Sequence, residues 1–231
     1  MTSALITGAS RGIGREVARV LGKGDIRVLA CVRDLSTAPR FAGVVPELCD
    51  VGDPESIRAL AARLAERSER LDILVNNAGV YRAPAREVWD VNVRGPLLLT
   101  RALVPLLNRG ARVVMVTSGL GRMQSQERSL VTRLRDPSLT LEDIAQMAQE
   151  APDGYGASKA ALNAMARLFA RELAPRGILV NAVSPGWAAT DMGGPGAPRT
   201  VQQGAESVLW GTRLAPDGPT GGTFEDGEPL E

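Results

Sequence analysis

The sequence predicts a single doubly wound α/β domain, in which helices cover both faces of a seven-stranded parallel sheet. Short apolar runs rich in β-branched residues alternate with longer stretches of helical periodicity, a pattern typical of βαβ units. The chain has 231 residues, a length that suits one large domain with a full core. Because no repeat, low-complexity tract or linker divides the chain, we expect one domain spanning residues 1–231.

The expected strands are short segments with apolar, β-branched composition. Each is bounded by turn-forming residues or by a stretch of helical periodicity, and most are followed by a polar or glycine-containing segment. We expect strands at Ala4–Thr7, Arg27–Val32, Val44–Cys49, Ile73–Asn76, Val113–Thr117, Leu179–Val183 and Gly222–Phe224.

Capping residues and prolines indicate where the helices begin and end. The first helix opens in the glycine-rich segment that follows the first strand. An N-cap residue followed by an N1 proline, in Asp53-Pro54-Glu55, predicts a helix that reaches about Arg67. The remaining helices are expected from Pro84 to about Leu107 with an interruption at Gly95-Pro96, from Tyr155 to about Ala174 with a stop at Pro175, and from about Val201 to Leu214.

One segment is longer than the alternation of strands and helices requires. The 36 residues between Ser118 and Tyr155 exceed what a strand-to-helix connection needs. Thr140 and Asp143 have the spacing of a capping box, with Asp in place of the usual Glu. We therefore expect a helical insertion over residues 120–153. It is either a surface elaboration, or a wall over a substrate site or a block to oligomerisation.

Composition gives no reason to expect a nucleic acid or a membrane as partner. The 27 basic and 26 acidic residues leave a net charge of +1. No apolar run approaches the ~18 residues that a membrane span needs. A strand pattern begins by Ala4, which leaves no room for a signal peptide. We expect a cytoplasmic protein.

The sequence contains no histidine, which excludes Ser-His-Asp and Cys-His hydrolytic sites and histidine metal sites. Cys31 and Cys49 both lie in apolar, strand-like runs, so reduced core residues are a better interpretation than a disulfide or a metal pair. We expect no metal. A general acid must then be Tyr, Lys, Cys, Asp or Glu.

Tyr155 and Lys159 are the candidates for acid–base chemistry. At positions i and i+4 of a helix, their side chains share one face. A tyrosine normally titrates near pH ~10 and a lysine near ~10.4, but a fixed cation stabilises a phenolate and lowers the pKa of the phenol. Such a phenol suits carbonyl–alcohol chemistry. The same spacing also fits a half-buried tyrosine beside a solvated lysine, so its meaning depends on whether a cofactor site lies nearby.

A glycine-rich turn between the first strand and the first helix predicts a dinucleotide site. In Thr7-Gly8-Ala9-Ser10-Arg11-Gly12-Ile13-Gly14, the glycines allow a tight turn, and the helix N-terminus offers unpaired N–H groups to a pyrophosphate. An ordinary strand–turn–helix is the alternative. Arg33 follows the second strand and, with Arg11, suits a 2′-phosphate, which favours NADP over NAD. Asp34 could instead hold the ribose or pair with Arg33.

Three further motifs follow strands, where ligands of such sheets bind. The turn Asn76-Asn77-Ala78-Gly79 follows the fourth strand, although it could serve only to end that strand. Ser118 follows the fifth strand. Ser184-Pro185-Gly186 ends the sixth strand, and Thr190 lies just beyond it.

In this order, the motifs resemble those of the short-chain dehydrogenase/reductase family: T-G-x-x-x-G-x-G, N-N-A-G, a strand-end serine, Y-x-x-x-K and P-G-x-x-x-T. The resemblance covers essentially the whole chain and implies a Rossmann-type fold. Within the family, the chain looks most like the carbonyl-reductase branch. This likeness rests on Pro185–Met192, the insertion around residues 139–143 and the ending at residues 218–224.

The resemblance also implies catalytic roles. Tyr155 would donate a proton to the carbonyl oxygen, while Lys159 would hold the nicotinamide ribose and lower the pKa of the tyrosine. Ser118 would orient the substrate oxygen, with Thr117 as a reserve candidate. Asn92 matches the asparagine that supports a water-linked proton relay in the family.

The implied cofactor is NADPH/NADP+, with NADH less favoured. Asp50 would contact the adenine, Asn76 the adjacent ribose and Thr190 the nicotinamide carboxamide. The complete set of expected cofactor-contacting residues is Gly8, Ser10, Arg11, Gly12, Ile13, Gly14, Arg33, Asp50, Val51, Asn76, Ala78, Gly79, Tyr155, Lys159, Pro185, Gly186 and Thr190.

The expected activity is NADPH-dependent reduction of an aldehyde, ketone or quinone, with a small molecule as the substrate. Two alternatives are a cofactor-binding regulator with little turnover and an alcohol dehydrogenase that works in the oxidative direction. A short Gly- and Pro-rich segment follows Gly186, which suggests an open pocket or a mobile loop. Trp187 and Met192 are either pocket walls or core residues. The insertion favours a monomer over a homodimer or tetramer.

Overall fold

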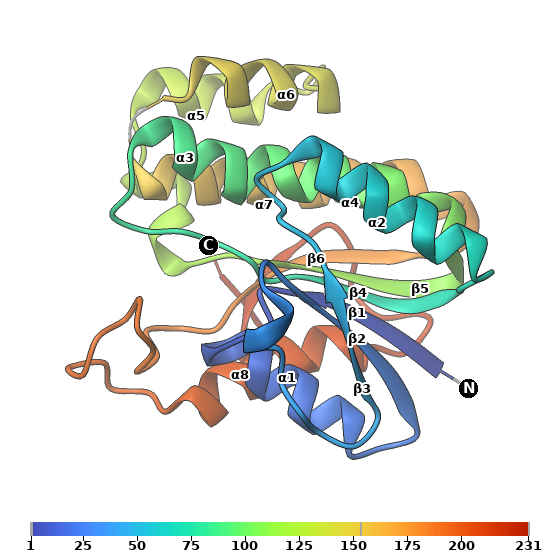
Figure 1. The fold of residues 1–231 in the computed structure, drawn as a ribbon. Coiled ribbons are helices and arrows are strands. Elements are labelled where there is room, and N and C mark those ends of the chain that lie inside the picture. The colour runs from blue at the N-terminus through green and yellow to red at the C-terminus, as the bar shows by residue number, and fades with distance from the viewer. Residues whose placement is uncertain (1, 153, 231) are drawn as a thin grey trace.

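The protein forms one eight-stranded sheet with helices on both faces (Figure 1). The computed structural model describes residues 2–152 and 154–230. The strand order is β3-β2-β1-β4-β5-β6-β7-β8, and every neighbouring pair is parallel except β7 and β8. The strands are β1 (Thr2–Thr7), β2 (Ile26–Val32), β3 (Val44–Leu48), β4 (Leu71–Asn76), β5 (Leu107–Val116), β6 (Leu179–Ser184), β7 (Thr223–Glu225) and β8 (Glu228–Pro229).

The seven predicted parallel strands are confirmed, and the structure adds a short antiparallel edge strand, β8. The hairpin that produces β8 turns at Asp226 and Gly227, whose φ angles are +54° and +84°. An Asp-Gly pair with two positive φ angles is the usual requirement of a two-residue hairpin turn. This dipeptide is visible in the sequence and could have predicted the additional strand.

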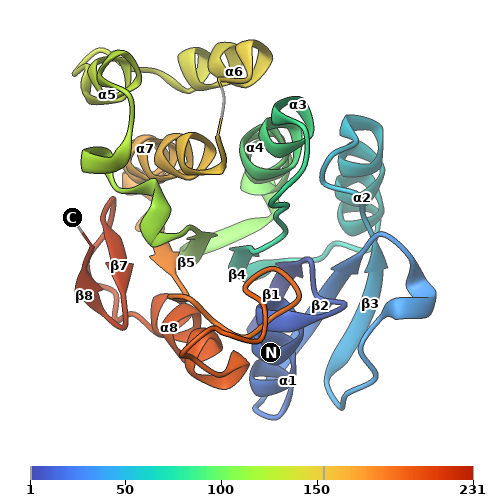
Figure 2. The same ribbon diagram turned by 90° about the vertical axis from the view of Figure 1, so that its left-hand side faces the viewer.

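Helices α1 (Gly12–Gly22) and α8 (Val201–Thr212) pack together on one face of the sheet. The other face carries α2 (Pro54–Glu66), α3 (Ala85–Trp89), α4 (Gly95–Leu103) and α7 (Tyr155–Leu173) (Figure 2). Each face buries its own apolar cluster, one beneath α1 and α8 and the other beneath α2, α4 and α7. The sheet therefore has two covered faces, as a doubly wound fold requires.

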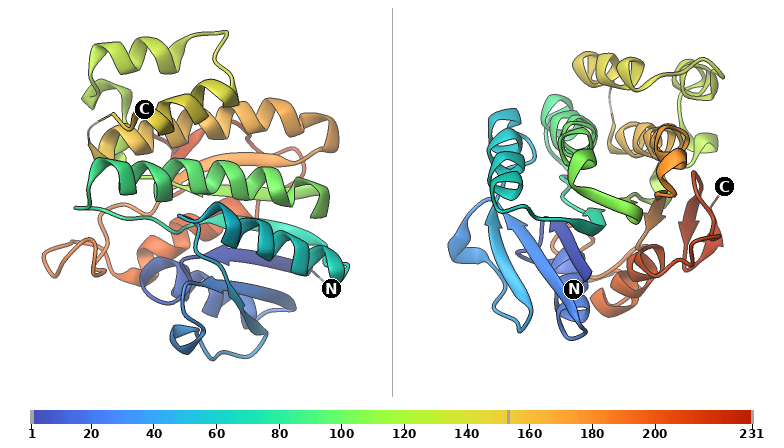
Figure 3. Two further views of the ribbon diagram at one scale, coloured as in Figure 1. Left: turned by 45° about the horizontal axis from the view of Figure 1, so that its top comes forward. Right: turned by 90° about the vertical axis from the view of Figure 1, so that its right-hand side faces the viewer.

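The predicted helix starts at Asp53 and Thr140 are confirmed. The Asp53 side chain accepts a hydrogen bond from the Glu55 backbone N–H, and Pro54 occupies the first turn of α2. Thr140 and Asp143 form the expected reciprocal capping box of α6 (Leu141–Glu150). With α5 (Arg128–Arg135), α6 forms an outer layer over α7, as Figure 3 shows. Residues 128–135 and 141–150 of the segment before Tyr155 are thus helical, while residue 153 lies outside the described residues.

The helix predicted from Pro84 to about Leu107 is interrupted earlier and ends earlier than expected. A π-helical turn spans Asp90–Arg94 and separates α3 from α4, which begins at Gly95. The helix ends at Leu103, because Leu107 already pairs with Leu71 and starts β5 six residues before the predicted Val113. Tertiary pairing has overridden local helical preference in this segment.

The order of the strands places a crevice beside β1. From β1 the chain moves outward through β2 and β3, then returns to the other side of β1 with β4. In open α/β sheets, ligands bind at this switch point, beyond the carboxyl ends of the strands. In the described part of the chain, no helix is both long and apolar enough to cross a membrane.

Candidate functional site

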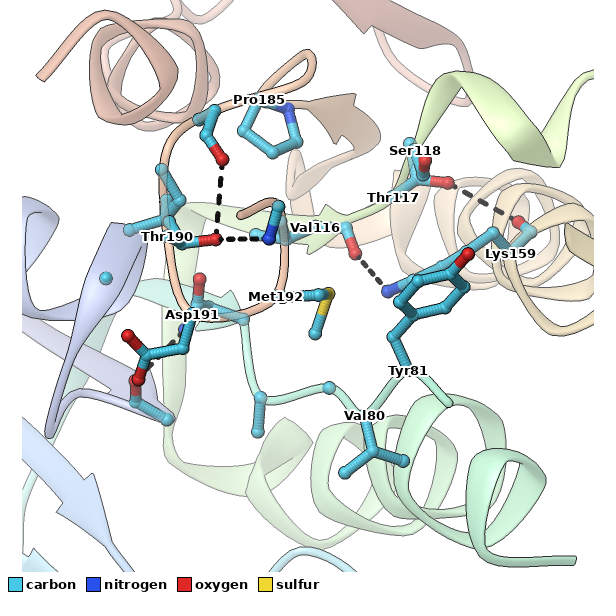
Figure 4. A pocket seen from close by; sticks show the side chains of 18 of the residues that line it. Val80, Tyr81, Val116, Thr117, Ser118, Lys159, Pro185, Thr190, Asp191 and Met192 are labelled. Carbon is cyan, nitrogen blue, oxygen red and sulfur yellow. Dashed lines mark hydrogen bonds between the residues drawn. The ribbon is translucent and has the colours of Figure 1, made fainter. Parts of the chain in front are cut away.

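A cavity of about 1000 Å³ opens at the carboxyl ends of the strands (Figure 4). Its walls come from segments that follow β1, β2, β3, β4, β5 and β6 and from the start of α7. Most of the expected site residues line it: Gly8, Ser10, Arg11, Gly12, Ile13, Arg33, Asp50, Val51, Ala78, Gly79, Ser118, Tyr155, Lys159, Pro185, Gly186 and Thr190. Gly14, Asn76 and Asn92 are not part of the wall.

Tyr155 and Lys159 occupy the first turns of α7 and both face the cavity. Lys159 is only 3% exposed, and its Nζ donates a hydrogen bond to the Val116 carbonyl at 2.8 Å. This Nζ lies 5.5 Å from the centroid of the Tyr155 ring. Burial lowers the pKa of Lys159 to about 8. The lysine is thus a buried amine that titrates near neutral pH.

The pKa of Tyr155 differs from the expectation that Lys159 would lower it. Burial is the largest influence and raises the pKa to about 12, a shift that a hydrogen bond with Ser118 opposes. The Lys159 Nζ donates its hydrogen bond to the Val116 carbonyl and lies 5.5 Å from the centroid of the Tyr155 ring. Tyr155 is consequently protonated at neutral pH, the state that an acid requires.

Ser118 follows β5 and is the hydroxyl that faces Tyr155. Its Oγ also accepts a hydrogen bond from the Leu120 backbone N–H at 3.2 Å. The neighbouring Thr117 is buried, and its Oγ1 donates to Asn163 Oδ1 on α7 at 2.6 Å. This hydrogen bond joins the end of β5 to α7. Because the Thr117 hydroxyl is used in it, Ser118 is the better candidate of the two to bind a ligand.

Asn92 lies in the π-helical turn and is fully buried behind the segment that follows β4. Its amide holds both backbone groups of Val80, accepting from the N–H at 2.8 Å and donating to the carbonyl at 3.0 Å. It also donates to Ser158 Oγ on α7 at 3.2 Å. A Cβ on Gly79 would lie 3.3 Å from Asn92 Oδ1 and 3.6 Å from Lys159 Nζ. Asn92 therefore fixes the segment that separates it from the cavity.

The glycine-rich loop presents a helix start without a capping side chain. Gly8 and Gly12 have φ angles of +65° and +55°, which favour glycine. Arg11 is the N-cap of α1 and makes no side-chain capping bond, whereas α6 and α8 both begin with capping boxes. The first N–H groups of α1 lack such a partner beside the cavity. An uncapped, glycine-lined helix start of this kind fits a pyrophosphate.

Asn77 connects this loop to β4, a role that the sequence did not assign. Its Nδ2 donates to the Thr7 carbonyl at 2.8 Å, and its backbone N–H donates to Thr7 Oγ1 at 3.0 Å. A Cβ on Gly14 would collide with the same Asn77 amide, so Gly14 permits close packing and does not line the cavity. The second asparagine of the Asn76-Asn77 pair was the feature of the sequence that could have indicated this role.

The structure does not bring the Asn76 side chain to the cavity. Its Nδ2 donates to Thr100 Oγ1 at 3.1 Å and contacts Met115 Sδ at 3.2 Å. Its Oδ1 is buried without a hydrogen-bond partner in the described part of the chain. The side chain therefore packs between β4, β5 and α4 and is not part of the cavity wall.

The positions of the charged residues after β2 are consistent with the expectation that Arg33 binds a 2′-phosphate. Arg33 lines the cavity, whereas Asp34 does not. The Asp34 carboxylate accepts hydrogen bonds from the Ser36 backbone N–H at 2.8 Å and from Ser36 Oγ at 2.7 Å, which lower its pKa. Across the cavity, Arg11 pairs with Asp191 at 3.0 Å, and both side chains are exposed. Asp34 is thus engaged in a local turn and makes no ion pair with Arg33.

Large apolar side chains form the mouth of the cavity. Trp187 and Met192 are 60% and 43% exposed and line it, so they are pocket walls and not core residues. Tyr81 is an addition that no sequence pattern indicated. Its ring meets the Tyr155 ring edge-on, with centroids 4.9 Å apart. Figure 4 shows Tyr81, Lys159 and Met192 facing the same space.

The segment after β6 packs over the glycine-rich loop. Thr190 Oγ1 accepts a hydrogen bond from the Gly193 N–H at 3.1 Å, and the Trp187 indole donates to the Gly193 carbonyl at 2.9 Å. The Thr190 methyl group would lie 3.3 Å from a Cβ placed on Gly12. These contacts give the Gly- and Pro-rich segment a defined turn beside the cavity.

Comparisons with known proteins agree with this arrangement. The family model described as short chain dehydrogenase matches residues 2–130, and the model described as Enoyl-(Acyl carrier protein) reductase matches residues 139–215. Carbonyl reductase [NADPH] 1 of Rattus norvegicus is 30% identical over 96% of this chain and 95% of its own length.

Solved structures are similar over the whole chain. Salutaridine reductase from Papaver somniferum has a TM-score of 0.84 at 27% identity and covers 98% of this chain and 100% of its own. The NADPH-bound carbonyl reductase from chicken fatty liver has a TM-score of 0.77 at 27% identity, with 99% and 93% covered. The strand order, the site geometry and the family match agree, and the chain belongs to the short-chain dehydrogenase family.

Proposed function

We propose that this protein reduces a carbonyl compound, an aldehyde, ketone or quinone, to the alcohol with NADPH as the hydride donor. The observation that carries the proposal is the placement of Ser118, Tyr155 and Lys159 in the same cavity as an uncapped helix N-terminus and Arg33. The similarity to relatives named carbonyl reductase [NADPH] supports both the reaction and the cofactor.

The residues present fit a phosphorylated dinucleotide. The N-terminus of α1 and the glycine-rich loop would hold the pyrophosphate, and Arg33, assisted by Arg11, would hold the 2′-phosphate. Asp50 and Thr190 remain candidates for the adenine and the carboxamide. When bound, NADPH would supply the hydride, which adds to the carbonyl carbon.

Tyr155 would transfer its proton to the carbonyl oxygen as the hydride arrives. Its raised pKa keeps the phenol protonated before the reaction. Ser118 would donate a hydrogen bond to the same oxygen and stabilise the charge that develops there. The protonated Lys159, held in place by the Val116 carbonyl, would stabilise the phenolate that remains. Asn92 would act through Val80, by fixing the segment opposite Tyr155.

Replacing Tyr155 with phenylalanine tests this proposal. The Tyr155→Phe variant keeps the ring that packs against Tyr81 but lacks the proton. We expect kcat for NADPH oxidation with an aldehyde panel to fall at least about 100-fold, the usual contribution of a general acid. The Kd for NADPH, measured by fluorescence titration, should change by less than about threefold. That change corresponds to a binding free energy of ~0.7 kcal/mol at most. Undiminished turnover by the variant would contradict the assignment.

A further inference from the structure

The cavity contains two arginines that the proposed cofactor does not require. Its cationic side chains are Arg11, Arg33, Arg82, Arg122 and Lys159. The dinucleotide would engage Arg11, Arg33 and Lys159. The other two lie on segments that flank the reacting group: Arg82 directly follows Tyr81, and Arg122 is four residues beyond Ser118.

The carboxylates of the cavity wall all have partners elsewhere. Asp191 pairs with Arg11 at 3.0 Å, and Glu225 accepts a hydrogen bond from Ser184 Oγ at 2.7 Å. Asp50 accepts a hydrogen bond from the Gly52 backbone N–H at 2.9 Å. Among residues 2–152 and 154–230, neither Arg82 nor Arg122 forms an ion pair. The three acids of the wall therefore contact groups other than Arg82 and Arg122.

Arg82 is held at the cavity in a conformation that arginine rarely adopts. Its φ angle is +57°, in the left-handed region. Its guanidinium lies 5.4 Å from the centroid of the Tyr81 ring, which in turn packs on Tyr155. Asn92 fixes the backbone of Val80 immediately before this pair. A backbone in the left-handed region, next to a segment fixed by a buried amide, places this cationic side chain against Tyr81, the ring that packs on Tyr155.

The surface around these arginines is apolar. Tyr81, Leu120, Trp187 and Met192 are between 40% and 60% exposed, and all four line the cavity. Arg122 also borders a second cavity of about 310 Å³, whose wall includes Arg135 and Arg167. Clustered charge of one sign raises the local concentration of an oppositely charged ligand. The mouth thus combines apolar walls with a positive edge.

We infer that the preferred substrates are carbonyl compounds in which an apolar, aromatic body bears a carboxylate, and that Arg82 and Arg122 bind this anion. Guanidinium groups match the planar geometry of a carboxylate and are weakly hydrated, so they suit an apolar rim. The rings of Tyr81 and Trp187 would contact the body of the substrate. This inference rests on the proposed carbonyl reduction and narrows its substrate class.

Turnover of two matched aldehydes tests the preference. 4-Formylbenzoate and its methyl ester share an aromatic body and an aldehyde but differ in charge. We expect the wild-type kcat/KM for the acid to exceed that for the ester about tenfold, the scale of a charge-assisted hydrogen bond. The ratio should fall towards one at high salt, because exposed charges are screened. A ratio of one in the wild type at low salt would overturn the inference.

Substitutions of Arg82 and Arg122 test whether these residues produce the preference for the acid. Arg82→Ala and Arg122→Ala should each reduce the acid-to-ester ratio about threefold, and the double variant should bring it near one. Arg82→Lys, which retains the charge, should recover part of the ratio. Arg58→Ala removes the charge of another exposed arginine, on α2 and away from the cavity, and should preserve the ratio. An unchanged ratio in the double variant would overturn the inference.

A binding measurement separates the anion site from the reaction. The Tyr155→Phe protein with bound NADP+ is titrated calorimetrically with each aldehyde. Tighter binding of the acid that depends on Arg82 and Arg122 supports the anion site, even if the wild type oxidises no NADPH and the proposed reaction fails. Equal binding of acid and ester, or no binding of the acid, would overturn the anion site whatever the turnover.

Discussion

At the scale of single residues, the ionisation of Lys159 determines the pH range in which the proposed reaction proceeds. The lysine is protonated below its pKa of about 8 and neutral above it, because its burial disfavours the charged form. Tyr155, with a pKa raised to about 12, stays protonated throughout the neutral range. Of these two residues, the lysine is therefore the one that changes charge between pH 7 and 10.

We expect kcat for carbonyl reduction to fall as the pH rises through about 8, because a neutral amine cannot stabilise the phenolate. A pH profile of kcat measured with saturating NADPH would show this limb. In Lys159→Arg, the cation persists to much higher pH. The limb should then shift out of the measured range, and an identical limb in this variant would assign the titration to another group.

The sequence could predict which residues lie in the site where the segments that carry them reach the carboxyl edge of the sheet. Ser118 follows β5, and Tyr155 and Lys159 begin α7, so both segments reach the edge of the sheet where its parallel strands end. The sequence could not show which side chain of the pair Asn76-Asn77 faces the site, because successive strand residues point to opposite faces. The structure turns Asn76 into the interior and uses Asn77 to hold the glycine-rich loop. Which of the two faces the loop depends on packing against α4.

At the scale of elements, the helix starts with local caps were the most predictable. Side-chain to backbone contacts at Asp53 and Thr140 span three residues or fewer and are visible in the sequence. The π-helical turn was not predictable, because its Asn92 bonds to Val80 and to Ser158, far apart in the chain. Elements defined by long-range contacts leave little trace in local sequence.

The cap of α6 gives a test of element stability. Thr140→Ala removes the hydroxyl that accepts from the Asp143 backbone N–H, while Asp143 can still accept from the backbone N–H of residue 140. The variant should lower the free energy of unfolding by about 1 kcal/mol, measured by urea denaturation. Thr132→Ala provides the control, because this threonine is exposed on α5 and bonds only to its own helix. Equal losses of stability in the two variants would contradict a specific role for the cap.

At the scale of the whole molecule, the outer layer of α5 and α6 leaves α7 without an open apolar face. Thirteen of the nineteen residues of α7 are buried, including Ala160, Ala164 and Phe169. A helix buried on most of its circumference is an interior element, not a docking surface. We therefore propose that the protein is a monomer.

Light scattering coupled to size exclusion tests this proposal. The expected mass is near that of the 24.4 kDa chain, and it should not change with protein concentration. A homodimer that pairs through α7 would have to displace α5 and α6, which bury Leu134 and Ile144 against the same core. A mass near twice that of the chain would show that another surface mediates assembly.

The wall of the cavity extends along the sequence from Gly8 to Glu225, nearly the full length of the chain. Its segments become neighbours only after β1 has paired with β4, and β5 with β6, across long stretches of chain. Closing such long loops is slow compared with the formation of individual helices. During refolding, cofactor binding should therefore appear after most of the helical content has formed. Cofactor binding would therefore report completed folding, since a fragment that lacks Gly8 or Glu225 does not contain the whole wall.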